Sequence, residues 1–205
     1  MQIICVLNAH EAPVLLDTID SIRKHLTQDI VVVVDGAKRD CLNGHTVPAS
    51  VVQGFIHGAP KSPYRNTTLG LMLAYQAYPK ADWYCYIEYD CLVASAKVKQ
   101  DLAALPPDVF CIGNDLRVTP HINLDFAKLV VKNRLPEARY LLGCCVFYRH
   151  ALVSALAADD IFSRLLWYTN DCTQGYFPLY NGYDVAEHLF PTLAAHYGGD
   201  VRGWA

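Results

Sequence analysis

The chain has 205 residues, of which 53% are apolar and 18% charged, and its 17 basic and 20 acidic side chains leave a formal charge of −3. This composition predicts one folded domain over residues 1–205, because a single core can grow to roughly 250 residues and so apolar a chain is not disordered. The absence of a Lys/Arg block argues against nucleic acid as a partner.

In the first half of the chain, short apolar runs alternate with amphipathic helical segments. Strands are predicted at residues 3–7, 30–34, 51–56 and 83–87. Helices are predicted from Pro13, from a cap at Asn66 or Thr67, and from a cap at Ser95. The alternation is typical of an α/β fold with a mostly parallel central sheet and helices on both faces.

The second half of the chain is less regular. Strands are predicted at residues 109–112 and 141–148, and helices at 149–158 and 184–197. Residues 159–183 are rich in aromatic side chains and show no clear period, so no element is predicted there. No run reaches about 18 apolar residues, so no membrane-spanning segment is expected, and peripheral contact with a membrane stays open.

The positions of the cysteines indicate in which cellular compartment the protein is expected. Five of the eight lie inside apolar runs, where a thiol packs as a small hydrophobic group: Cys5, Cys85, Cys111, Cys144 and Cys145. No Cys-x-x-Cys pair occurs, and the first residues lack the pattern of a secretory leader. A reducing, cytoplasmic location is therefore predicted.

Polar residues follow three of the predicted strands at the point where each strand ends. These are residues 8–11, residues 35–36 and residues 88–90. In open α/β sheets, ligands bind beyond the carboxyl ends of the strands. None of the three loops contains a dinucleotide-binding glycine motif or a P-loop, but a nucleotide held by carboxylates and a metal is compatible with them.

Glu88 and Asp90 lie two residues apart at the end of a strand, where both carboxylates can face one pocket while Tyr89 turns inward. Such a pair suits a hard divalent cation, Mn²⁺ or Mg²⁺, completed by phosphate oxygens. The alternative is a solvated acidic turn.

The order of these segments resembles the nucleotide-sugar-dependent glycosyltransferases of the GT-A fold, in particular family 2. The resemblance covers roughly residues 2–158. It is carried by a strand entering a polar loop at 6–11, the helical series Leu16, Thr18, Ile19, Ser21 and Ile22, the run 30–36, Arg65-Asn66, the strand 83–90 and the segment 143–152 with Arg149. It implies a single-domain, Rossmann-like GT-A fold, with Asp90 and Glu88 binding the metal; Glu88 stands where the family motif has Asp.

The resemblance also implies how the donor is bound. Leu7, Asn8 and Glu11 would line the base and ribose pocket, and Asp35 would contact the nucleoside. Arg65 would meet a diphosphate oxygen through a charge-assisted bond, or is a surface cation before a helix.

A carboxylate near the start of the last helix is the candidate base. Family members often place an acid there to take the proton from the acceptor hydroxyl, and Asp184 and Glu187 occupy that position. The same Asp-x-x-Glu spacing predicts a capping box, in which Asp184 caps the helix and Glu187 returns to the cap N–H.

The sequence thus predicts a metal-dependent glycosyltransferase that moves a sugar from a nucleotide-diphosphate donor to a hydroxyl acceptor on a saccharide, lipid or protein. Two rivals stay open. A sugar nucleotidyltransferase would share the sheet and the metal acids, although residues 8–11 lack the glycine and lysine of its usual loop. A non-catalytic module that binds a nucleotide or sugar would keep the fold without turnover.

Overall fold

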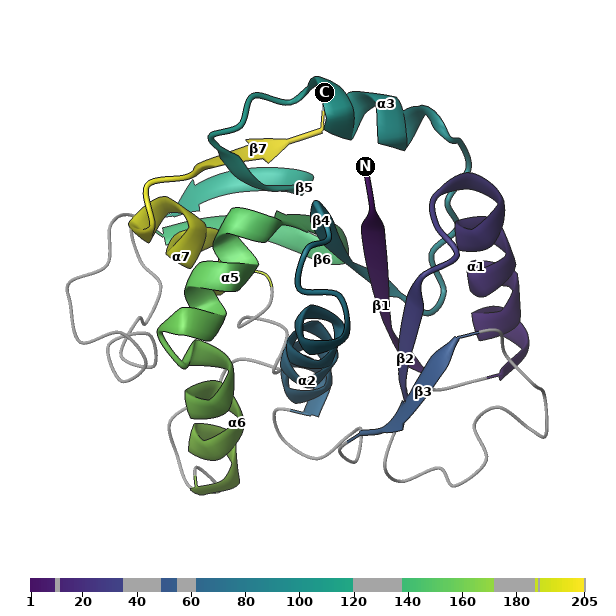
Figure 1. Cartoon of the computed structure of the whole chain (residues 1–205), viewed down its shortest axis with the longest axis horizontal. Coiled ribbons are helices and arrows are strands. Elements are labelled where there is room, and N and C mark those ends of the chain that lie inside the picture. The colour runs from purple at the N-terminus through teal and green to yellow at the C-terminus, as the bar shows by residue number, and fades with distance from the viewer. Residues whose placement is uncertain are drawn as a thin grey trace.

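The computed structural model describes residues 1–9, 12–34, 49–54, 62–119, 138–171, 187 and 189–204. In this part of the chain, seven strands form one sheet in the order β3-β2-β1-β4-β6-β5-β7 (Figure 1). The strands are β1 (Ile3–Ala9), β2 (Ile30–Val34), β3 (Ser50–Gln53), β4 (Trp83–Glu88), β5 (Val109–Thr119), β6 (Ala138–Arg149) and β7 (Asp200–Gly203).

The strand directions define where a ligand is expected. β3, β2, β1 and β4 are parallel, β6 is antiparallel to β4 and β5, and β7 is parallel to β5. The chain leaves β1 toward β2 on one side, and β4 then pairs with β1 on the other side. This reversal makes the carboxyl ends of β1 and β4 the topological switch point, the usual place for a ligand in such sheets.

Helices cover both faces of the sheet (Figure 1). The side chains of α1 (Ala12–His25) and the α3 helix (Lys97–Ala104) pack in one core cluster. The opposite face is covered by α2 (Ser62–Ala77), α5 (His150–Ala158), α6 (Ile161–Asp171) and α7 (Phe190–His196). The α/β fold class predicted from the sequence is therefore confirmed.

The spacing of apolar residues in the sequence explains which side chains are buried in the first half of the fold. Every residue of β1 and β2 is buried, as expected for central strands without polar alternation. The helix predicted from Pro13 has one apolar face toward the core, because Leu15, Ile19, Ile22 and Leu26 recur at helical spacing and are each at most 1% exposed. None of the described helices is long and apolar enough to cross a bilayer.

The start of α2 was predicted wrongly. The helix begins at Ser62, so Asn66 and Thr67 lie inside it and are at most 1% exposed, rather than capping it. Both residues face the sheet: a Cβ added to Gly54, just beyond β3, would lie 2.6 Å from Asn66 Oδ1. Polar residues that favour caps can thus be recruited to a buried helix face, where partners in the sheet replace the cap.

The second half departs further from the sequence prediction. β5 and β6 extend beyond the predicted 109–112 and 141–148, and α6 and β7 were not predicted. The last helix is described from Phe190, not from residue 184, and Pro191 lies in its first turn, where a missing N–H costs little. The stretch before it, residues 172–186, lies outside the described residues.

Candidate functional site

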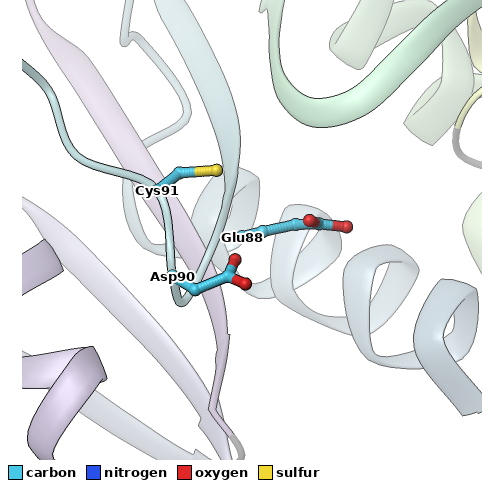
Figure 2. Close-up of side chains that lie close together, drawn as sticks. All are labelled: Glu88, Asp90 and Cys91. Carbon is cyan, nitrogen blue, oxygen red and sulfur yellow. The ribbon is translucent and has the colours of Figure 1, made fainter.

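The end of β4 carries a group of potential metal ligands. Glu88 is the last residue of the strand, and the chain turns through Tyr89 and Asp90, where the N–H of Cys91 donates to the carbonyl of Glu88 at 3.1 Å. One ligand atom each from Glu88, Asp90 and Cys91 lies within 4.8 Å of the other two. Figure 2 shows the two carboxylates and the thiol projecting to the same side of the loop.

Along this loop, side chains that pack against the core alternate with side chains that are exposed to solvent. Tyr89, Cys91 and Val93 are partly buried against the core cluster under α1. Asp90 is exposed, and Leu92 is 67% exposed. Tyr89, Cys91 and Val93 therefore hold the loop against the core, while the Asp90 side chain is exposed to solvent.

Glu88 lies near two other carboxylates. Burial raises the pKa of its carboxyl, and the nearby carboxylates of Asp90 and Glu187 raise it further. Among the described residues, no Lys or Arg forms an ion pair with Glu88 or Asp90. A bound cation would relieve this repulsion, so the site is electrostatically suited to one.

Cys91 was not predicted as a site residue. The signal in the sequence is its position directly after Asp90, whereas the Cys-x-x-Cys spacing typical of metal-binding cysteines is absent. Burial, the nearby Cys144 and the two carboxylates raise the pKa of the Cys91 thiol to about 12. The thiol is therefore protonated at neutral pH, and coordination through sulfur would release that proton to solvent.

Glu187 lies close to these acids although it is distant in sequence. Its charge raises the pKa of Glu88 and also that of Tyr140 on β6. It is half-buried and precedes α7 by three residues. The structure thus brings three of the predicted acids to one end of the sheet.

β6 is irregular beside this site. Gly113 on β5 pairs with Val146, and the next residue, Asn114, pairs with Leu142, so three residues of β6 bulge out of its pairing with β5. The Asn114 amide donates to Cys144 Sγ within the bulge at 3.5 Å. Bulges of this kind redirect side chains and are common next to functional sites.

Asn8 and Leu7 occupy opposite faces of β1. Asn8 pairs in register with Glu88 on β4 and is 4% exposed. Its amide donates to Thr67 Oγ1 at 3.0 Å and to the Tyr86 hydroxyl at 3.2 Å, which ties β1 to α2 and β4 directly beneath the acids. The Leu7 side chain is fully buried in the core under α1. Any contact from Leu7 to a donor would use its backbone.

The remaining predicted residues lie wholly or partly outside the described part of the chain. Glu11, Asp35 and Asp184 lie outside the described residues, and Arg65 is in α2 with its side chain outside them. Their proposed roles stay predictions.

Arg149, part of the family resemblance, lies at the other end of β4. It pairs with Trp83, the first residue of that strand, and its guanidinium stacks 4.4 Å from the centre of the Trp83 ring. Its Nε donates to the carbonyl of Val109 at 2.6 Å, and its Nη2 donates to that of Pro106 at 2.9 Å. Arg149 is a structural clamp and not part of the acidic site.

Comparison with known proteins supports the fold. No family model matches the sequence, and no curated protein matches it. Among solved structures, a glycosyltransferase involved in the glycosylation of the major capsid of PBCV-1 aligns over all of this chain and 81% of its own, with 12% identity and a TM-score of 0.54. A mannose-1-phosphate geranyltransferase from Thermus thermophilus aligns over 99% of this chain and 73% of its own, with 11% identity and a TM-score of 0.54.

A third structure of the same kind extends the set. The 4-diphosphocytidyl-2C-methyl-D-erythritolsynthase from Anaerococcus prevotii aligns over 99% of this chain and 86% of its own, with 12% identity and a TM-score of 0.51. At such low identity the likeness concerns the fold alone. The chain has the GT-A-like α/β fold that is shared by glycosyltransferases and nucleotidyltransferases.

Proposed function

We propose that the protein is a metal-dependent glycosyltransferase, similar to family 2, that moves a sugar from a nucleotide-diphosphate donor to a hydroxyl acceptor. The observation that carries this proposal is the group of Glu88, Asp90 and Cys91 at the carboxyl end of β4, with the charge of Glu187 beside it. The group lies at the switch point of a GT-A-like sheet, where a nucleotide ligand is expected.

The residues present fit a divalent cation. Asp90 and Glu88 would hold Mn²⁺ or Mg²⁺, because carboxylate oxygens suit both ions and the crowded negative charge favours a cation. Cys91 would add sulfur, which Mn²⁺ accepts more readily than Mg²⁺ does. When bound, the ion would supply a positive charge that stabilises the departing diphosphate.

Two further acids, Glu187 and Asp184, would serve the transfer of the acceptor proton. Glu187 is the proposed base, because its carboxylate lies near Glu88 and is attached to a different element. It would orient the acceptor hydroxyl and take its proton. Asp184, the other acid predicted for this role, would cap the segment before α7 or assist Glu187.

Donor contacts complete the proposal. Leu7 and Asn8 lie near the end of β1, where Asn8 pairs with Glu88, so the chain that follows, with Glu11, would meet the nucleoside there. Asp35 directly follows β2, the next strand along the sheet, and would bind the same nucleoside. Arg65 would pair with the diphosphate. The described cysteines are free thiols, which supports a cytoplasmic location.

A thermal-shift screen tests the proposal directly. Nucleotide-diphosphate sugars with different bases are added with Mn²⁺, with Mg²⁺, or with a chelator, since a ligand selective for the native state raises its stability. We expect one donor to stabilise the protein only with metal, and release of nucleoside diphosphate when a matching acceptor is added. Donor binding without transfer or hydrolysis over a broad acceptor panel would instead identify a non-catalytic binding module.

A sugar nucleotidyltransferase is the second candidate. The Anaerococcus prevotii synthase aligns nearly as well as the PBCV-1 glycosyltransferase, so the fold favours neither activity. Residues 8–11 read Asn-Ala-His-Glu, without the glycine or lysine that a triphosphate loop uses. Incubation with nucleoside triphosphates and sugar phosphates decides between the two, because only the nucleotidyltransferase releases pyrophosphate.

A further inference from the structure

The loop that carries Asp90 and Cys91 is fastened to α1. β4 ends at Glu88, and residues 89–95 are not part of a strand in the described sheet. Thr18 and Ser21 of α1 provide the contacts instead. The Thr18 hydroxyl donates to the carbonyl of Tyr89 at 2.5 Å, and the N–H of Val93 donates to Ser21 Oγ at 3.0 Å.

The two hydroxyls act together. They are three residues apart, which puts them on one face of the helix. Ser21 Oγ also donates to the carbonyl of Thr18 at 2.8 Å, so its hydrogen is directed into the helix and its lone pair is left for Val93. Thr18 is 0% exposed, so its hydroxyl has no water to exchange with.

The fastened points bracket the ligands. Tyr89 precedes Asp90, and Val93 follows Cys91 by two residues. Between them, the N–H of Cys91 returns to the carbonyl of Glu88. Two anchors from α1 and one from β4 therefore fix the backbone on both sides of Asp90 and Cys91.

We propose that Thr18 and Ser21 are positioning residues, which hold the loop of residues 89–93 in the shape that lets Glu88, Asp90 and Cys91 share one cation. This inference rests on the proposed function. Metal sites depend on such supporting bonds because ligand atoms must be held in place before the ion arrives. A loop freed from α1 would sample positions in which the three ligand atoms no longer converge.

The test compares variants of the full chain that remove each hydroxyl with variants that remove an equivalent hydroxyl elsewhere. Thr18→Val and Ser21→Ala break the two anchors, and Thr18→Ser keeps the first. Thr68→Val is the control for Thr18, because Thr68 is also a fully buried helical threonine and its Oγ1 has no hydrogen-bond partner among the described residues. Ser154→Ala is the control for Ser21, because Ser154 also donates to the carbonyl three residues before it.

Two measurements are made on each variant. Calorimetric titration with Mn²⁺ gives the affinity for the ion. Hydrogen–deuterium exchange of the peptide that covers residues 89–95 shows how firmly the loop backbone is held in place. We expect Thr18→Val and Ser21→Ala each to weaken Mn²⁺ binding about tenfold and to speed exchange in that peptide, with Thr18→Ser close to wild type. Both controls should keep wild-type affinity and exchange.

The outcomes separate this inference from the proposed function. A wild-type chain that does not bind Mn²⁺ overturns the proposed function and the positioning role with it. If wild type binds Mn²⁺ but Thr18→Val and Ser21→Ala bind it as tightly as the controls do, only the positioning role is overturned. Unchanged exchange in the loop peptide overturns the anchor itself, whatever the metal affinity.

Discussion

The two ends of β4 differ in how their charged side chains are compensated. At the amino end, Arg149 stacks on Trp83 and donates to the carbonyls of Pro106 and of Val109, the first residue of β5. Asp82 there accepts the N–H of Gln2 at 2.6 Å, and its own carbonyl accepts that of His150 at 3.0 Å. At the carboxyl end, Glu88 and Asp90 crowd one another.

This difference separates stability from function within one short strand. A charge that is stacked and hydrogen-bonded stabilises the native state, and its loss is costly. Acids that repel one another without a described cation destabilise it, and are kept where a ligand compensates. Substitutions at the amino end should therefore change stability and leave ligand binding intact, and those at the carboxyl end should do the reverse.

The largest expected effect is at Asp90. Asp90→Asn keeps the size of the side chain but removes the charge that would bind the cation, so we expect sugar transfer to fall about 1,000-fold. Donor-dependent release of nucleoside diphosphate measures it. Asp101→Asn, which removes an acid paired with Lys97 on α3, is the control and should retain activity. Turnover of Asp90→Asn within twofold of wild type would contradict the metal assignment.

Arg149→Met tests the amino end. The variant keeps an apolar chain over Trp83 but loses the stacked charge and the bonds to Val109 and Pro106, so unfolding in urea should be easier by about 3 kcal/mol. Arg202→Met removes an exposed ion pair with Asp200 and should cost less than about 0.5 kcal/mol. A changed Mn²⁺ affinity in folded Arg149→Met would break the proposed separation of the two ends.

Glu187→Gln distinguishes a base from a cap. A base is needed only while the acceptor proton moves, so kcat should fall about 100-fold while donor affinity and the urea midpoint stay near wild type. Loss of a cap would instead lower stability and leave the rate of the folded protein unchanged. Comparing single-turnover rates with urea unfolding on the same preparation shows which role applies.

The sequence predicted the parallel half of the fold because each of its elements has one dominant signal. β2 is an unbroken β-branched run, and α1 has four buried residues at helical spacing. β4 ends at Glu88, close to the predicted end of the strand, so Glu88 and Asp90 follow it as expected from the sequence. Here local pattern and tertiary structure agree.

Other features were hidden because they depend on distant partners. α2 starts before Asn66, and Thr67, which was expected as a cap, instead accepts a hydrogen bond from Asn8 of the sheet. Cys91 joins the acids only once the chain turns after Glu88. The bonds from Thr18 and Ser21 to the loop join residues about 70 positions apart, and no local pattern records such a contact.

Cys91→Ser sharpens the description of the carboxyl end. Sulfur binds Mn²⁺ better than Mg²⁺, so the variant should bind Mn²⁺ about tenfold more weakly and Mg²⁺ almost as wild type does. Titration with each ion measures the change in preference. Cys144→Ser is the control, because Cys144 is also a half-buried thiol but is not in the group with Glu88 and Asp90. Equal losses for both ions would assign Cys91 to packing.

Glu88→Gln gives the smallest effect, and its sign is opposite to that of most substitutions. Burial, Asp90 and Glu187 hold the pKa of Glu88 above its ordinary value in the folded chain. Without metal, the native state therefore keeps its full stability below the ordinary pKa and loses part of it as the pH rises through the folded value. Glu88→Gln removes this loss, so urea unfolding with a chelator should show the variant gaining on wild type from acid to neutral pH.

The gain should stay below about 1 kcal/mol, because the Glu88 carboxylate is partly solvated. Saturating Mn²⁺ should reverse the order, since the ion stabilises wild type and the variant has lost a ligand. Asp101→Asn should give no such gain, because its carboxylate is paired with Lys97 at 2.7 Å instead of being crowded by other acids. A wild-type chain that is the more stable of the two at neutral pH without metal would mean that Glu88 is compensated within the protein, and the contrast between the two ends of β4 would be lost.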